Sequence, residues 1–335
     1  MELLPVKPAQ SNGITSIVVD SFETPVQDLS TDKPFIQANT EAANLQEITH
    51  NHIIPVFIKD NEPLISHGDF IDTTVQVISE VYRGETILSP CIRVSHPVKG
   101  RIPEARNKPA IDLQEWEKTL YYERMAFIIE VPGIWDTIEG NTLSLTIGGI
   151  KAYNMDNLYG RKGSDEHFKL FIGFQNRVCM NLKVWSDGYT SDVRVSNINQ
   201  LKACIRALVE NYNATQHISA LKSLTNYALT EQQFALLIGR SRMYHHLPPV
   251  LKSVITPLLL SDTQISTVVK DYYRDGSFCK LDNGDISLWR LYNLFTGSNK
   301  SSYIDTFLDR SISVYNFTEG IRNALDSKTP HWFLH

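Results

Sequence analysis

Several features are missing from this sequence, and each absence argues against a class of protein. The apolar stretch at residues 247–260 contains Lys252 and is too short to cross a membrane. The four cysteines are widely spaced and form no C-x-x-C pair, which favours free thiols over a disulfide framework or a zinc knuckle. The N-terminus lacks the basic-then-apolar order of a secretory signal. We therefore expect a cytoplasmic protein with no membrane partner.

Recognisable catalytic signatures are also missing. The chain contains no nucleophile elbow, no dinucleotide-binding glycine fingerprint and no metalloprotease helix. The sequence therefore predicts no catalytic residue, no cofactor and no metal ligand, and an enzyme is the less favoured class. The formal net charge of −5 and the pI of about 6.1 argue against coating nucleic acid through bulk charge, although they allow a local basic groove.

Negative charge is concentrated at the start of the chain. Residues 1–47 carry seven acidic and two basic residues, so this segment holds the whole net charge of −5. It is also poor in aromatic residues, which favours an acidic, extended or disordered N-terminal tail with one strand at residues 14–19. We expect the folded body to begin at residue 48, and a linked hypothesis is that the acidic segment screens basic residues elsewhere.

The clearest pattern of the body is an alternation of apolar and polar residues between Asn141 and Gly188. Leu143, Leu145 and Ile147 alternate with hydroxyl residues, and the same period returns at residues 168–174 and 178–184. A period of two is typical of strands with one buried and one solvated face. Residues 48–195 are therefore expected to form a sheet-rich α+β region, with an edge strand at residues 53–58 and helices at residues 69–81 and 112–122.

The period becomes helical after Ser196. Apolar residues recur on one helical face between Ile198 and Tyr212, and capping boxes occur at residues 230–233 and 261–264. Residues 196–335 are expected to form an all-helical region. The predicted fold class is thus α+β, with a mainly antiparallel sheet in the N-terminal half and the helical half packed on it.

The main candidate for a functional site is a basic, proline-broken strip at residues 93–108. This strip contains five Lys or Arg residues and one His, but only one Glu. Two tyrosines follow it in the sequence, and Arg161 and Lys162 lie in a later connection between strands. Such cations neutralise phosphates, and tyrosines stack on bases. A solvated loop with its charges paired is the alternative. The candidate nucleic-acid-binding residues are Arg93, Lys99, Arg101, Arg106, Lys108, Tyr121, Tyr122, Arg161 and Lys162.

Three further motifs have a simpler interpretation. Residues 229–249 have the small-residue spacing of a helix-turn-helix, but Pro248 and Pro249 favour an ordinary helix ending at Gly239. Residues 296–302 resemble half of a phosphate loop, but a turn between two helices is favoured. His50, His52, His67 and Asp69 suggest a metal site, although polar surface histidines are the favoured interpretation.

Five longer segments carry a family resemblance: IRVSHPVKGRIPEA, EKTLYYERMAF, LSLTIGGIKAYN, FIGFQNRVCMNL and LYNLFTGSNKSSYIDTFLDR. Together they resemble an uncharacterised bacterial family of unknown function found in gut-anaerobe genomes and mobile elements. Residues 177–181, and residues 293–296 with 303–305, are more distantly similar to the phage/plasmid-like protein family of unknown function. Neither resemblance implies an activity or a catalytic residue; both imply a mobile-element context.

These observations lead to three hypotheses of function. The first is a mobile-element accessory protein that binds DNA or RNA through the basic strip. The second is a non-enzymatic interaction module for a host or element-encoded protein, because the helical half contains eight tyrosines. The third is a metal-dependent hydrolase.

Overall fold

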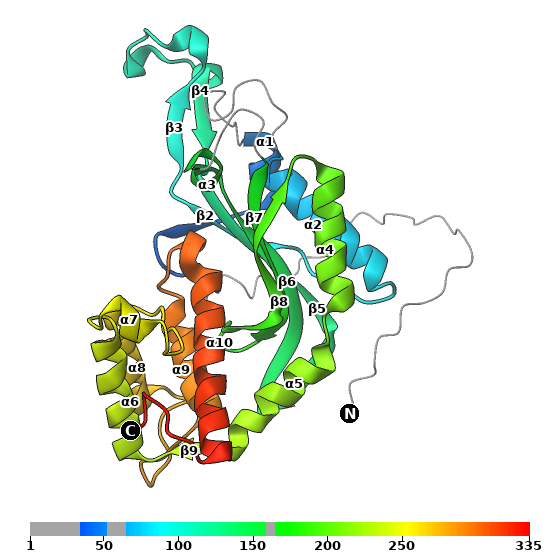
Figure 1. The fold of residues 1–335 in the computed structure, drawn as a ribbon. Coiled ribbons are helices and arrows are strands. Elements are labelled where there is room, and N and C mark those ends of the chain that lie inside the picture. Colours follow the sequence, from blue (N-terminus) through cyan, green and yellow to red (C-terminus); the bar gives the residue numbers. More distant parts are fainter. Residues whose placement is uncertain (1–33, 52–64, 159–164) are drawn as a thin grey trace.

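The computed structural model describes residues 34–51, 65–158 and 165–335, which form an α+β fold (Figure 1). The strands predicted at residues 14–19 and 53–58 lie outside the described residues, as do His52, Arg161 and Lys162. Within the described part, the centre of the N-terminal half is a six-stranded sheet, and most of the helices come later in the chain.

The sheet is antiparallel throughout, with the strand order β1-β2-β5-β6-β7-β8. Its last four strands follow one another along the chain as a meander. The strands are β1 (Thr40–Ala43), β2 (Cys91–Ser95), β5 (Arg124–Ile138), β6 (Asn141–Ala152), β7 (Glu166–Asn176) and β8 (Leu182–Val195). The prediction of a mainly antiparallel N-terminal sheet is confirmed.

One face of the sheet is covered by α2 (His67–Val81) and α4 (Ile198–Asn211), which lie side by side. Phe70 of α2 packs edge-on against Phe127 and Phe168, with ring centroids 4.9 Å away in both cases. Gly149 of β6 makes room for this ring, because a Cβ there would lie 2.4 Å from the Phe70 ring. A side chain at position 149 would therefore push α2 off the sheet.

The opposite face is covered by the first half of α10 (Ile304–Ser327). Ile304, Phe307 and Leu308 belong to one apolar cluster with residues of β5, β6, β7 and β8. The side chain of Asp309 strengthens this contact, because its carboxylate pairs with Lys169 Nζ at 2.5 Å and accepts a hydrogen bond from Tyr189 at 2.5 Å. The sheet is therefore a central layer between helices.

Because both faces are covered, the prediction that the alternating polar residues are solvated is wrong. Ser144, Thr146 and Lys183 are all fully buried. Lys183 lies under α9 (Leu288–Asn299), where its Nζ donates to Asn293 Oδ1 at 2.7 Å and to Thr296 Oγ1 at 2.8 Å. Alternation located β6 and β7 correctly, but it does not report that helices cover both faces of the sheet.

The C-terminal half is helical apart from a short two-stranded ladder of β9 (Ala228–Leu229) and β10 (Ile286–Ser287). The capping boxes at Thr230 and Ser261 are confirmed. Its other helices are α5 (Ala214–Ser223), α6 (Glu231–Tyr244), α7 (Pro249–Lys252) and α8 (Asp262–Arg274). Two short helices, α1 (Leu45–Asn51) and α3 (Tyr153–Leu158), belong to the N-terminal half.

Two of the weaker motifs are resolved by these helices. The helix α6 continues without interruption past Gly239 to Tyr244, so residues 229–249 form no helix-turn-helix, and Gly239 does not end the helix. Residues 296–299 of the half phosphate loop form the last turn of α9, and only the residues after Asn299 make the predicted turn before α10 begins at Ile304.

Three predicted boundaries need correction. Phe35 and Ile36 are buried and β1 pairs with β2, so the folded body includes residues before 48. Burial of this apolar pair and the strand hydrogen bonds outweigh the polar composition around them. The helix predicted at residues 112–122 is replaced by 3₁₀ turns and a strand. The third alternating strand begins only at Leu182, because Met180 has a left-handed φ of 57° in the turn before it.

Candidate functional site

A β hairpin extends away from the body of the molecule (Figure 1). Its strands β3 (Val98–Arg101) and β4 (Lys118–Tyr121) pair with each other in an antiparallel two-stranded sheet. Residues 98–121 are called the arm below, and residues 102–117 are called the arm tip. The arm tip contains three 3₁₀ turns, at Pro103–Ala105, Ala110–Asp112 and Glu115–Glu117.

The register of the hairpin gathers cations on one side. Lys99 lies opposite Leu120, and Arg101 lies opposite Lys118. Directly opposite residues share a face of a ribbon, and so do residues two positions apart on one strand. Lys99, Arg101 and Lys118 therefore share a face, which is called the basic face. The other face carries Val98 and Tyr121 instead.

The remaining charges of the arm are mixed. The arm has five basic and four acidic residues, so its net charge is only +1. Lys118 pairs with Glu115 at 2.6 Å, but Glu115 is 91% exposed, and an ion pair of this kind contributes little in water. Arg101 is half-buried, and its guanidinium donates to the Lys108 carbonyl. Arg106 lies exposed on the arm tip.

Lys108 has a structural role inside the arm tip. Its ammonium donates to the carboxylate of Glu117, whose side chain is only 3% exposed. The same carboxylate accepts a hydrogen bond from the Gln114 amide at 2.9 Å. The hydrogen bond from Lys108, followed by that from Gln114, lowers the pKa of Glu117. This pair closes the arm tip, so Lys108 has less freedom to reach a ligand than the sequence suggests.

The base of the arm is fixed to the body through Tyr122. This side chain is 3% exposed, and its hydroxyl donates to Glu47 of α1 at 2.5 Å. Burial, followed by the contact with Glu47, raises its pKa. The Tyr122 carbonyl lies 2.8 Å from His67 Nε2 of α2. Tyr121 is half-buried, with its ring centroid 6.3 Å from that of Tyr153. Tyr122 therefore anchors the arm and is not placed to stack on a base.

Arg93 lies on the main sheet rather than on the arm. Its guanidinium donates to the Thr40 carbonyl at 2.6 Å and to the Thr40 hydroxyl at 2.8 Å, and burial lowers its pKa. The structure thus brings Lys99, Arg101 and Arg106 together on the arm. It assigns Arg93, Lys108 and Tyr122 to structural contacts, and Arg101, although on the basic face, also donates to the Lys108 carbonyl.

Sequence reasoning missed three residues of the arm. Lys118 completes the basic face, while Ile111 and Trp116 lie at the arm tip with 91% and 71% of their surfaces exposed. The expected helix over residues 112–122 placed Trp116 on an apolar face. The short pattern KTLY at residues 118–121, taken as a strand opposite residues 98–101, would have revealed Lys118.

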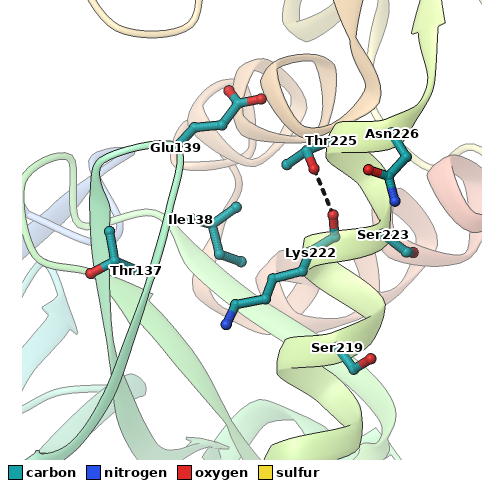
Figure 2. Close-up of a pocket in the computed structure, with 8 residues that line it drawn as sticks. All are labelled: Thr137, Ile138, Glu139, Ser219, Lys222, Ser223, Thr225 and Asn226. Atoms are coloured by element: carbon teal, nitrogen blue, oxygen red, sulfur yellow. Dashed lines mark hydrogen bonds between the residues drawn. The ribbon is translucent and has the colours of Figure 1, made fainter. Parts of the chain in front are cut away.

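A separate open depression of about 490 Å³ lies between α5 and the turn that joins β5 to β6 (Figure 2). Several of its polar groups have structural partners. Lys222 pairs with Asp136 at 2.7 Å, and its carbonyl accepts a hydrogen bond from Thr225. The lining residues are Thr137, Ile138, Glu139, Ser219, Lys222, Ser223, Thr225 and Asn226. None of these residues forms a nucleophile–base pair with another, and we assign no chemistry to the depression.

The proposed histidine site is only partly within the described residues. His67 is buried against Tyr122, and the carboxylate of Asp69 accepts from the Ser66 amide in the capping box of α2. Over residues 34–51, 65–158 and 165–335, no group of three or more His, Cys, Asp or Glu is arranged to hold a metal ion. None of the four cysteines, all within the described residues, forms a disulfide. No helix in those ranges is long and apolar enough to cross a membrane.

Comparison with known families gives one match. The model of a family described as "Domain of unknown function, B. Theta Gene description (DUF3871)" matches residues 14–334. The chain therefore belongs to this family. A comparison with curated proteins and a comparison with solved structures each found no match.

Proposed function

We propose that this protein binds nucleic acid through the basic face of its arm. The observation that carries the proposal is the hairpin register, which places Lys99, Arg101 and Lys118 on one face of a projecting ribbon. When such side chains neutralise phosphates, they release the salt counterions that the phosphates had bound, and this release supplies affinity that is independent of sequence. A two-stranded ribbon is also narrow enough to lie in a nucleic-acid groove.

The charge distribution supports a local rather than a global interaction. The whole chain has a net charge of −5, and seven acidic residues lie within residues 1–47. The register of the arm nevertheless places three cations on one face of a projecting ribbon. We therefore expect modest, salt-sensitive binding without strong sequence preference.

The cellular setting belongs to the same proposal. The family resemblance of the sequence suggests an accessory protein of a phage- or plasmid-like element that acts in the cytoplasm. Binding to DNA or RNA of that element would be the role of the arm.

The proposal is tested by charge reversal. The variant K99E/R101E/K118E is compared with K270E/R274E/K328E, which makes the same charge change at exposed residues away from the arm. Fluorescence anisotropy with single-stranded DNA, duplex DNA and RNA at about 50 mM salt measures affinity. We expect the arm variant to lose at least about tenfold in affinity and the control to lose much less, because only the arm cations contact phosphates. Equal losses in the two variants, or no binding by the wild type, would refute the proposal.

A second candidate is the protein-interaction module, and one observation favours it. Val250 and Val254, around the short helix α7, are 79% and 83% exposed, with Leu251 beside them at 51%. An exposed apolar patch of this kind is typical of an interface. The tyrosines of the helical half contribute less than expected, because Tyr244, Tyr272, Tyr292 and Tyr315 are buried. A stable protein partner captured after nuclease treatment by wild type, but not by V250S/V254S, would favour this candidate.

A further inference from the structure

The arm tip presents two large apolar side chains to solvent. Ile111 is 91% exposed and Trp116 is 71% exposed, although both side chains are typically at least partly buried in folded proteins. Trp116 precedes Lys118 of the basic face by two residues. An exposed planar ring close to cations is the combination that single-strand-binding surfaces use, because the ring stacks on bases while the cations follow the backbone.

The backbone beneath Trp116 is held in place. Glu117, the next residue, is buried, and its carboxylate is bonded by Lys108 and by the Gln114 amide. The carbonyl of Glu117 also accepts a hydrogen bond from the Ile102 amide at 2.9 Å, which joins the two sides of the arm. The indole therefore projects from a fixed turn, and little conformational entropy is lost when it binds a flat partner.

The flat indole favours unpaired bases over a duplex. In a duplex the base faces are already stacked on each other, and a base step must be unstacked before a side chain can reach them. In a single strand the faces are accessible, and stacking on an aromatic ring is tolerant of sequence.

We propose that Trp116 stacks on unpaired bases of a single-stranded nucleic acid whose phosphates lie against Lys99, Arg101 and Lys118. This inference rests on the proposed function and specifies its ligand. It assigns Trp116 to base contact and the basic face to backbone contact.

The test separates bases from phosphates. Wild type and W116A are titrated with an oligodeoxythymidylate of about 20 nucleotides and with an abasic phosphodiester of the same length, at low salt. We expect the wild type to prefer the base-bearing strand by roughly 5- to 150-fold, the range of one aromatic stack. W116A should lose this preference and keep its affinity for the abasic strand, whereas W116F should keep most of it. The control W135A removes a tryptophan that is 41% exposed on β5, and it should behave as the wild type.

The outcomes distinguish the two proposals. If the wild type binds both strands equally in a salt-sensitive manner, the stacking inference fails and the proposed function stands. If W116A weakens binding to both strands equally, Trp116 supports the shape of the arm instead of contacting bases, and the inference is again refuted. If neither strand binds at low salt, the proposed function itself fails.

Discussion

His217 of α5 is a fully buried histidine surrounded by aromatic rings. The centroids of Phe174, Trp185 and Tyr315 lie 5.6, 5.3 and 6.1 Å from its own. The Tyr212 hydroxyl lies 2.5 Å from Nδ1, and burial raises the pKa of that phenol well above 10, so the phenol is neutral. Burial lowers the pKa of His217 to about 3. The ring is thus neutral in the folded protein near neutral pH.

This arrangement predicts a loss of stability in mild acid. Below its ordinary pKa of 6.5, His217 binds a proton in the unfolded chain, while the folded protein excludes that proton until about pH 3. The free energy of unfolding should therefore fall by roughly 1 kcal/mol per pH unit from this residue as the pH drops below 6.5. Denaturant titrations between pH 6.5 and 5 should show a smaller slope in H217Q than in the wild type. The exposed control H246Q should keep the full slope; an equal slope in H217Q and the wild type would contradict the account.

Lys183 is a second buried titratable residue, and it acts in the opposite pH range. Burial lowers its pKa to about 7, and its neighbours are the Asn293 and Thr296 side chains and the rings of Trp289 and Tyr292. Between pH 7 and 10.5 the unfolded chain keeps a proton that the folded protein releases. The contribution of Lys183 to stability therefore rises with pH in that window.

The testable quantity is the change of the unfolding free energy with pH. K183M should flatten the rise in unfolding free energy between pH 7 and 9, a rise of roughly 1 kcal/mol per pH unit in the wild type. The window stops at pH 9 because buried tyrosines add their own dependence above it. K270M, at an exposed lysine of α8, serves as the control and should leave the rise unchanged. A rise of the same size in K183M and the wild type would show that Lys183 is not the titrating residue.

At the scale of elements, the arm behaves as a unit closed by Glu117. Glu117→Gln removes the negative charge of the carboxylate that accepts hydrogen bonds from Lys108 and from the Gln114 amide. The arm tip should open more often, and cleavage by trypsin after Arg106 should become faster at neutral pH. The midpoint of global unfolding should change little, because the arm tip adds few residues to the core. Glu115→Gln, at a carboxylate that is 91% exposed, is the matched control. Equal cleavage of E117Q and wild type would show that the pair does not hold the arm tip.

The packing of β8 against α9 explains two of the sequence motifs. Residues 177–181 and 293–296, which carry the more distant resemblance, meet at a buried junction where Asn181 Nδ2 donates to the Asn293 carbonyl at 3.1 Å. Lys183 and Thr296 extend this junction between β8 and α9. These motifs hold the sheet to the helical half.

Much of the fold could be predicted from local patterns. Period-two alternation located β6 and β7, and capping boxes located the starts of α6 and α8. What the patterns missed depends on contacts distant in sequence. The polar residues Ser144 and Lys183 are buried because α10 and α9 cover the sheet, and no local rule reports that cover. The start of the body before residue 48 likewise depends on pairing with β2.

The candidate site was predicted in part. A strip of cations was visible in the sequence, but the pairing of β3 with β4 decides which of them share a face. Arg93 and Lys108 were included because they are close in sequence, and they make intramolecular contacts instead. Lys118 was left out because its segment was assigned to a helix. Register, rather than composition, defines the basic face.

At the scale of the whole molecule, we propose that an acidic protein binds nucleic acid through three cations on a projecting arm. The salt-sensitive part of such binding must come from the arm, because the remainder of the chain supplies no excess of positive charge. The logarithm of the binding constant for a single strand falls with the logarithm of salt concentration by about 0.7 per neutralised phosphate. Three arm cations therefore correspond to a slope of about −2.

The most direct test is this salt slope, measured by anisotropy with single-stranded DNA between about 50 and 200 mM salt. We predict a slope of about −2 or steeper for the wild type and for K270E/R274E/K328E, and a slope near zero for K99E/R101E/K118E. A wild-type slope near zero, or the same slope in the arm variant as in the wild type, would contradict the account.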